Sequence, residues 1–216
     1  MIAAVIFDLD GVLLESEQVW NEAKRELVEE RGGSWRDSAP RDMMGMSSPE
    51  WSAYLRDELG LDMDGAAISD AVVARLEAIY RERLPWIDGA REAVERMAAG
   101  WPLGLASSSN REIIDLFLAL SGLAELFAVT LSSEQVARGK PAPDVYLEAA
   151  RRLGVRPGDC LAVEDSENGI RAAKAAGMCV VVLPNTEWPP RGDALELADE
   201  VIGSMHELSP VPFRDR

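Results

Sequence analysis

The residues Ile2 to Phe7 (Ile-Ala-Ala-Val-Ile-Phe) run directly into Asp8-Leu9-Asp10-Gly11, and this stretch decides the fold. Six uncharged residues, four of them Ile, Val or Phe, predict a buried β-strand. Side chains alternate along a strand, so Asp8 and Asp10 should point the same way, and Gly11 lets the backbone turn sharply away. Two carboxylates this close repel each other unless a cation neutralises them. The stretch therefore indicates either a hard-cation site with a carboxylate nucleophile or a solvated Asp-Gly turn.

A serine-rich segment follows a second apolar strand pattern. Leu103–Ala106 runs into Ser107-Ser108-Ser109-Asn110, and a helix is expected from about Arg111. Consecutive hydroxyl groups before a free helix N-terminus suit an anion. Helix capping by Ser109 or Asn110 is the plainer explanation when this segment is taken alone.

Two later segments also carry polar groups after or between apolar patterns. Lys140 lies between a glycine and two prolines in Gly139–Asp144, just before a helical pattern, although most lysines in such loops are simply exposed. The strand pattern Cys160–Val163 ends in the adjacent carboxylates of Glu164 and Asp165 and leads into a helix over about 170–176.

The carboxyl ends of the strands in an open parallel sheet lie together at one edge, where ligands bind. Such a sheet would bring together carboxylates for a hard metal ion, a hydroxyl donor and one fixed cation. This set suits a phosphoryl group, because phosphoryl transfer depends on positioning and charge neutralisation. The side chains expected to meet are Asp8, Asp10, Ser107, Lys140, Glu164 and Asp165.

These segments resemble, in order, the four motifs of the haloacid dehalogenase superfamily, and their details are similar to its phosphatase and β-phosphoglucomutase-like branch. The resemblance implies an α/β fold: a Rossmann-like parallel sheet core with helices on both faces, plus a small all-helical cap domain inserted after the first strand. The motifs are Asp8-Leu-Asp-Gly-Val, Ser107, Lys140 in Gly-Lys-Pro-Ala-Pro-Asp, and Glu164-Asp165-Ser-x-x-Gly169.

The residues from 15 to 85 predict the cap, because they show helical periodicity, many charges and no convincing strand. We therefore predict a catalytic core of 1–14 and 86–216, a helical cap of 15–85, and hinges near 14–17 and 84–88. Expected cap helices cover about 19–28, a segment that begins with a capping box at Ser47–Glu50, and about 68–84. Core strands are expected at about 102–107, 127–131, 160–164, 179–183 and 201–202, and a helix at 90–99.

Length and composition fit a single core with a small accessory lobe, since the chain has 216 residues and is 47% hydrophobic. No apolar run is long enough to span a bilayer, and the N-terminal stretch lacks the features of a signal peptide. Cys160 and Cys179 lie in strand patterns and are expected to be reduced core residues. These features together predict a cytoplasmic protein.

Charge and histidine content exclude several functions. A net charge of −16 and a pI near 4.5 should repel nucleic acid and anionic membranes, so neither is an expected partner. The single histidine, His206, lies far from every motif, which argues against a Ser-His-Asp triad or a histidine-ligated zinc ion. The expected partner is a small phosphorylated metabolite, and the chain should be a monomer or a weak dimer.

The resemblance also implies a mechanism, that of a magnesium-dependent phosphatase of a small phosphomonoester such as a sugar phosphate. Asp8 would attack phosphorus to form an aspartyl-phosphate, and Asp10 would act as general acid and then general base. The implied Mg²⁺ ligands are Asp8, the Asp10 carbonyl, Asp165 and, through water, Glu164; the implied phosphate-binding groups are Ser107, the Ser108 amide and Lys140.

Three other activities are weighed against this one. Dehalogenases of the superfamily generally lack the second aspartate, so Asp10 argues against them. Sugar-phosphate mutases of this branch carry a cap-helix histidine where this chain has Trp20, and we expect tryptophan to offer no hydrogen-bonding group there. A non-catalytic binding protein on the same fold would be free to lose the motif residues, all of which are present.

Cap residues are expected to choose the substrate, whose identity the sequence does not give. Methionines before the Ser47 capping box are more often core residues, but the loop at Gly45 is a plausible substrate contact. The candidate specificity residues are Trp20, Asn21, Arg41, Gly45 and Ser47.

Overall fold

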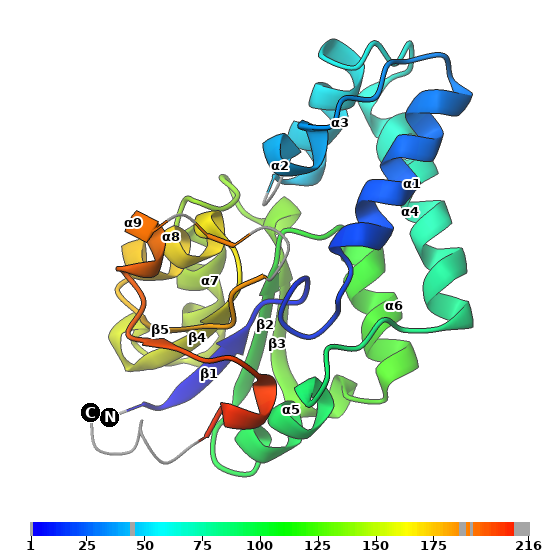
Figure 1. The fold of residues 1–216 in the computed structure, drawn as a ribbon. Helices are drawn as coiled ribbons and strands as arrows, with labels where there is room; N and C mark the ends of the chain where they lie inside the picture. Colours follow the sequence, from blue (N-terminus) through cyan, green and yellow to red (C-terminus); the bar gives the residue numbers. More distant parts are fainter. Residues whose placement is uncertain (1, 44–45, 186–188, 191, 210–216) are drawn as a thin grey trace.

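The computed structural model describes residues 2–43, 46–185, 189–190 and 192–209. Figure 1 shows a twisted sheet covered by helices, with a further group of helices beyond one end of the sheet. The predicted specificity residue Gly45 lies outside the described residues.

The described residues form one parallel sheet in the strand order β3-β2-β1-β4-β5-β6. The first strand lies in the middle, so the residues that follow it are flanked by the ends of β2 and β4. The predicted α/β fold is confirmed, and each predicted strand is present. The strands are β1 (Ala4–Phe7), β2 (Leu103–Ser107), β3 (Phe127–Ser132), β4 (Cys160–Glu164), β5 (Cys179–Val182) and β6 (Glu200–Val201).

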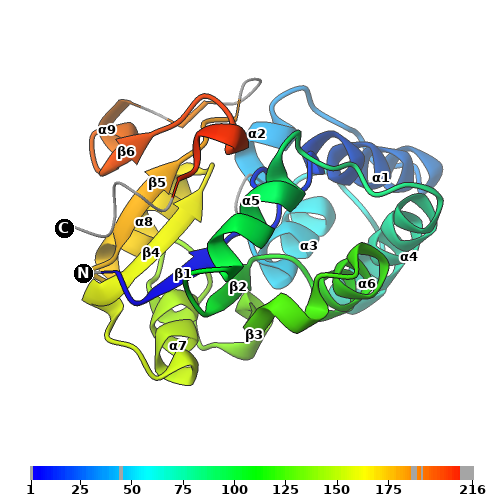
Figure 2. The ribbon, with the colours of Figure 1, turned by 90° about the horizontal axis from the view of Figure 1, so that it is seen from below.

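Helices cover both faces of this sheet, which explains why β1 carries no charge. Val5 and Phe7 belong to one buried cluster, whereas Ala4 and Ile6 belong to another on the opposite face. The first cluster includes residues of α5 (Ala90–Ala98) and α6 (Arg111–Ser121); the second includes residues of α7 (Asp144–Leu153) and α8 (Glu167–Ala175). Figure 2 shows α5 and α7 on opposite sides of β1 and β2.

Helix starts depend on capping residues that apolar periodicity does not reveal. Helix α8 begins at Glu167, earlier than the predicted start near Ile170, because the Ser166 hydroxyl accepts a hydrogen bond from the backbone N–H of Gly169 (3.1 Å). The short helix α9 (Gly192–Leu195) was not predicted.

The described residues between β1 and α5 form four helices: α1 (Glu17–Glu30), α2 (Ala39–Met43), α3 (Ser48–Asp57) and α4 (Gly65–Glu82). The predicted capping box of Ser47 and Glu50 begins α3. Helix α4 starts before the predicted residue 68, since the Asp64 side chain accepts a hydrogen bond from Ala66 N (3.0 Å). Helix α2 was not predicted.

The two chain segments that join these helices to the sheet run side by side. Leu14 and Trp86 form an antiparallel bridge, and the Glu15 N–H donates to the Pro85 carbonyl at 2.7 Å. Helix α4 also packs against α6. The chain therefore leaves the sheet for the helical segment just after the Asp8 motif, and it returns to the sheet beside the point where it left.

Two expectations from composition can be compared with the structure. Cys160 is buried, as predicted, whereas Cys179 is half-buried, and neither forms a disulfide among the described residues. Within the described part of the chain, every helix is too short or too polar to cross a bilayer.

Candidate active site

The carboxyl ends of three adjacent strands carry the polar residues that the sequence singles out. Phe7 of β1 pairs with Val163 of β4, so Asp8 lies beside Glu164. On its other side β1 pairs with β2, which ends at Ser107. Parallel pairing alone therefore brings these side chains to one edge of the sheet.

Three buried carboxylates and one buried ammonium group form the centre of this edge. The Lys140 Nζ lies 3.1 Å from Asp8 Oδ1 and 2.7 Å from Glu164 Oε1. Carboxylate oxygens of Asp8, Glu164 and Asp165 lie within 4.8 Å of one another. None of these four residues is more than 6% exposed. One lysine cannot neutralise three ionised carboxylates, so a further cation would be needed to balance the charge of the cluster.

Glu164 is held by more donors than its motif suggests. Its carboxylate accepts hydrogen bonds from Lys140, from the Tyr146 hydroxyl and from the backbone N–H of Asp165. Glu164 therefore fixes the position of Lys140, while its predicted water-mediated role at the metal stays a prediction. Tyr146 was missed as a site residue because it looked like part of the apolar face of α7.

Two glycines of the motifs make room for these carboxylates. Gly11 has φ +76°, and a Cβ there would lie 1.9 Å from Asp165 Oδ2. A Cβ at Gly169 would lie 1.9 Å from Glu164 Oε1. Both motifs thus need glycine, because a buried carboxylate occupies the space that any larger side chain at these positions would require.

Burial governs the protonation of the cluster. It raises the pKa of Asp8 to about 8, with Lys140 acting in the opposite direction and Glu164 adding to the rise. Burial and then Glu164 also raise the pKa of Asp165 well above its usual value. Burial acts to lower the pKa of Lys140, but Asp8 and Glu164 outweigh it and raise that pKa above normal. The lysine is therefore charged, while Asp8 and Asp165 ionise readily only beside another cation.

The donor set fits a divalent metal ion. Carboxylate oxygens are the ligands that hard cations prefer, and the buried Asp8 Oδ1 has the Lys140 ammonium at 3.1 Å but no other donor among the described residues. Asp8 and Asp165 are the best placed to hold the ion, because the oxygens of Glu164 are already occupied by hydrogen-bond donors.

We expect the metal-free protein to lose stability as the pH rises from about 4 to about 8, because Asp8 binds its proton more tightly in the folded state. Its pKa rises from 3.8 to about 8 on folding, so over this interval the unfolded chain has released a proton that the folded chain keeps. Mg²⁺ should take the place of that proton and stabilise the protein more at high pH. Thermal unfolding of the wild type and Asp8→Asn, with chelator or Mg²⁺, measures this; an Mg²⁺ effect independent of pH contradicts it.

The carboxylate of Asp10 is surrounded by hydrogen-bond donors from both the sheet edge and α1. Its Oδ1 accepts from the Trp20 indole N–H at 3.0 Å and from the Ser16 hydroxyl. Its Oδ2 accepts from the Ser109 hydroxyl and, at 3.4 Å, from the Ser107 hydroxyl. This arrangement holds Asp10 in one orientation beside the Asp8 cluster.

One expectation about this region is wrong. Trp20 does offer a hydrogen-bonding group, because the indole N–H is a donor and points at Asp10. Ser16 and Ser109 were not singled out as site residues. The serine run at 107–109 was a usable signal for Ser109, whereas nothing in the pattern around Ser16 distinguishes it from an ordinary helix-capping serine.

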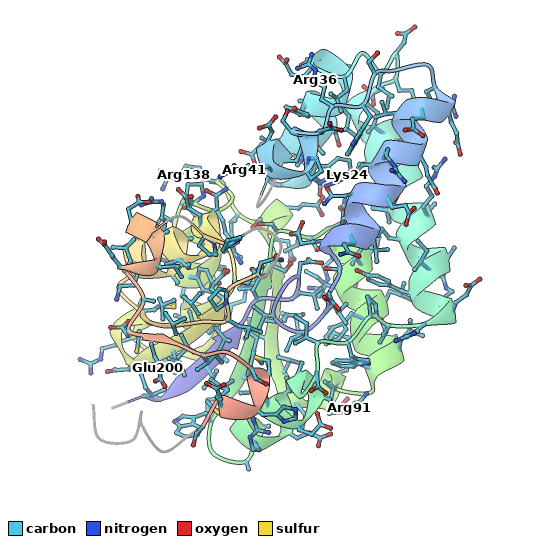
Figure 3. All side chains as sticks on the ribbon, in the orientation of Figure 1. Lys24, Arg36, Arg41, Arg91, Arg138 and Glu200 are labelled. Carbon is cyan, nitrogen blue, oxygen red and sulfur yellow. The ribbon has the colours of Figure 1, made fainter. Side chains whose placement is uncertain are left out.

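A small pocket of about 60 Å³ lies over this edge, lined by residues of the sheet edge and of the inserted helices α1, α2 and α3. Trp20 and Asn21 line it, as does Ser108, whose buried Oγ has no hydrogen-bond partner among the described residues. Arg41 and Ser47 are not among the described lining residues: Arg41 is exposed on α2 (Figure 3), and the Ser47 hydroxyl donates to Glu50 at 2.6 Å.

The fold and site together define a class of protein, that of α/β proteins with an acidic pocket at the carboxyl edge of a parallel sheet. Residues 2–177 match the family model of the haloacid dehalogenase-like hydrolases, and the chain belongs to this family. Hydrolases of this family typically use a divalent metal ion, which agrees with the buried acidic cluster.

Named relatives of this chain include phosphatases. It is 34% identical over 221 residues to hexitol phosphatase B from Escherichia coli (strain K12), covering 96% of this chain and 95% of the relative. The structure of CbbY from Rhodobacter sphaeroides in complex with phosphate has a TM-score of 0.87 and 29% identity, and all of both chains is covered. A mutant of that protein in complex with xylulose-1,5-bisphosphate has a TM-score of 0.86 and 28% identity over 99% of each chain. β-Phosphoglucomutase from Clostridium difficile, at 23% identity and a TM-score of 0.85 over 100% of this chain and 96% of that one, shares the fold.

Proposed function

We propose that this chain is a magnesium-dependent phosphatase that hydrolyses a small phosphomonoester, such as a sugar phosphate, through an aspartyl-phosphate. The observation that carries the proposal is the pairing of two aspartates with different surroundings in one pocket. Asp8 is buried, and among the described residues its Oδ1 has only the Lys140 ammonium beside it, at 3.1 Å, whereas Asp10 is held by four donors. The named phosphatases among the relatives support the same reaction.

In the first step, an Asp8 carboxylate oxygen attacks phosphorus in line with the ester oxygen. The new O–P bond forms as the P–O bond to the alcohol breaks, and the departing oxygen takes a proton from Asp10. In the second step, Asp10 takes a proton from water, the water oxygen attacks phosphorus, and inorganic phosphate leaves with the Asp8 carboxylate restored. The fixed orientation of Asp10 suits it to serve the oxygens on one side of phosphorus in both steps.

Charge is offset by several groups of this chain. Lys140 lies beside Asp8 and would neutralise phosphoryl oxygens. The Ser108 Oγ, which has no partner in the described part of the chain, would offer them a donor together with the backbone N–H groups of its loop. Mg²⁺ held by Asp8, Asp165 and the Asp10 carbonyl would supply further positive charge at the phosphoryl group.

The helical segment 15–85 is proposed to act as a cap on a core of 1–14 and 86–216. Its residues Trp20, Asn21 and Trp51 share the pocket with Asp8 and Asp10. A cap in this position excludes water from the nucleophile and selects among substrates. The paired segments near 14–17 and 84–88 would be its hinges, since only they connect it to the sheet.

The test is magnesium-dependent release of phosphate from a panel of small phosphomonoesters, including hexose 1-phosphates and 6-phosphates. Release that chelator abolishes is expected. Conversion of a hexose 1-phosphate to its 6-isomer without release of phosphate would instead identify a mutase. Neither reaction with any member of the panel would favour a binding protein on this fold.

We expect Trp20→Phe to lower kcat by roughly tenfold, because it removes the N–H that donates to Asp10 Oδ1 and keeps an aromatic ring in the pocket. Steady-state kinetics on the best panel substrate measure this change. A change in KM alone would show that Trp20 contacts substrate without orienting Asp10, and unchanged kinetics would show that Ser16 and Ser109 suffice.

A further inference from the structure

Lys24 is a buried ammonium group in the pocket that no step of the proposed reaction uses. It belongs to α1, is 6% exposed, and lines the same pocket as Asp8 and Asp10. Figure 3 shows it on the side of α1 that faces α2. The other buried residues of this helix, among them Trp20, Ala23 and Leu27, are apolar, so Lys24 interrupts an otherwise apolar face.

Two tryptophans hold the ammonium group. Its Nζ lies 5.1 Å from the ring centre of Trp20 on α1 and 5.0 Å from that of Trp51 on α3. The two rings are 6.0 Å apart and steeply inclined. Aromatic faces attract a cation, and two of them restrict where the ammonium can lie. Trp20 also donates to Asp10, so the position of Lys24 is linked to that of the reactive carboxylates.

No carboxylate within the described ranges forms an ion pair or hydrogen bond with this ammonium group. The carboxylates of Glu17 and Asp10 act on it only from a distance, and the Asp10 oxygens already accept hydrogen bonds from Trp20 and three serines. Burial consequently lowers the pKa of Lys24 to about 8, although both carboxylates act to raise it. An unpaired buried ammonium is unfavourable, and an anion beside it would remove that cost.

The contrast with Lys140 shows that the two lysines of the pocket differ in what they can bind. Lys140 already contacts Asp8 and Glu164, at 3.1 and 2.7 Å, and serves the reacting phosphoryl group. Lys24 contacts only aromatic rings, and its three N–H donors have no acceptor among the described residues. A ligand that enters the pocket is therefore the available source of an acceptor for Lys24.

We propose that Lys24 binds a second anionic group of the substrate, a carboxylate or a second phosphate, that is separate from the phosphoryl group transferred to Asp8. The proposal rests on the phosphatase function above and adds a specificity-determining residue to it. The preferred substrate is then a small phosphomonoester that carries another negative charge. The tryptophans fix the ammonium on the cap side of the pocket, so the substrate would bridge the sheet edge and the cap.

The test uses substrate pairs that differ in one anionic group: 3-phosphoglycerate against glycerol 3-phosphate, and fructose 1,6-bisphosphate against fructose 6-phosphate. Lys24→Met keeps an unbranched side chain of similar length between the tryptophans and removes the charge. Lys174→Met is the matched control, because this lysine pairs with Asp199 at 2.9 Å and is not among the pocket residues. The comparison of the two pairs tells a carboxylate from a second phosphate.

The wild type should prefer the more anionic member of at least one pair. Lys24→Met should lower kcat/KM for that member by about 10- to 100-fold and change it little for the other, as loss of a charged hydrogen bond predicts. Lys174→Met should behave like the wild type. Equal losses for both members of each pair, or no loss, would overturn the proposal and give Lys24 a purely structural role.

A binding measurement distinguishes failure of the anion-site proposal from failure of the phosphatase proposal. Calorimetric binding of the same four compounds to Asp8→Asn, with and without Lys24→Met, needs no turnover. Binding of 3-phosphoglycerate or fructose 1,6-bisphosphate that depends on Lys24 would support the anion site even if no phosphate is released by the wild type. Equal affinities with and without Lys24→Met, or no detectable binding, would count against the anion site.

Discussion

Asp8→Asn should lower the rate of phosphate release on the order of 10⁴-fold or more, a loss typical for removal of a nucleophile. The amide has the shape of the carboxylate but is a very poor nucleophile. Lys140 keeps its 2.7 Å contact with Glu164 in the variant, so the remaining site should stay in place. Initial rates on the best panel substrate at saturating Mg²⁺ measure the effect.

The variant should fold, which separates a chemical defect from a structural one. Burial raises the pKa of Asp8, meaning that its charge is unfavourable in the metal-free protein, and asparagine removes that charge. The metal-free variant should therefore unfold at neutral pH at a temperature no lower than that of the wild type. Asp37→Asn, at an exposed position outside the pocket, is the matched control. If Asp8→Asn kept a tenth of the wild-type rate, another group would have to be the nucleophile.

The meeting of the motif strands could be predicted because β1, β2 and β4 are short and apolar and carry polar residues at their carboxyl ends. The alternation of Val5 and Phe7 with Ala4 and Ile6 already implied a strand with two buried faces. Once the strands are parallel, the ends of β1, β2 and β4 must meet, so the meeting of the motif residues follows from topology alone.

The side chains that complete the site could not be predicted in the same way, because their partners lie on other elements. Tyr146 donates to Glu164 from the first turn of an amphipathic helix, where an apolar residue would fit the same pattern. Trp20 reaches Asp10 only because α1 leaves the sheet directly after the motif. Lys24 is buried between two tryptophans of different helices, an environment that no local pattern of one helix encodes.

Helix boundaries, too, could be predicted only where a local sequence pattern marks them. The capping box of Ser47 and Glu50 is a local pattern, and it was predicted correctly. The starts of α4 and α8 depend on single hydrogen bonds that the Asp64 and Ser166 side chains accept from backbone N–H groups, and the apolar periodicity of each helix does not reveal them.

Gly169→Ala should lower the free energy of unfolding by about 2–4 kcal/mol, through overlap in a buried site and disturbance of a charged hydrogen-bond network. The new Cβ would lie 1.9 Å from Glu164 Oε1. An exposed glutamate would swing aside at little cost. Glu164 is fully buried and is held by Lys140, Tyr146 and the backbone N–H of Asp165, so moving it breaks several hydrogen bonds at once.

Gly65→Ala is the matched control, since Gly65 also lies in the first turn of a helix, and its Cβ would meet Ser52 Cβ at an ordinary 3.8 Å. That variant should be stabilised by about 0.4–1 kcal/mol, because alanine restricts the unfolded chain. Denaturant unfolding of both variants, combined with kcat, tests the two effects together. Because Glu164 fixes Lys140, loss of stability in Gly169→Ala should be accompanied by loss of kcat. Equal stability of the two variants would mean that the Glu164 carboxylate moves freely, and Lys140 would then lack the fixed partner that places it beside Asp8.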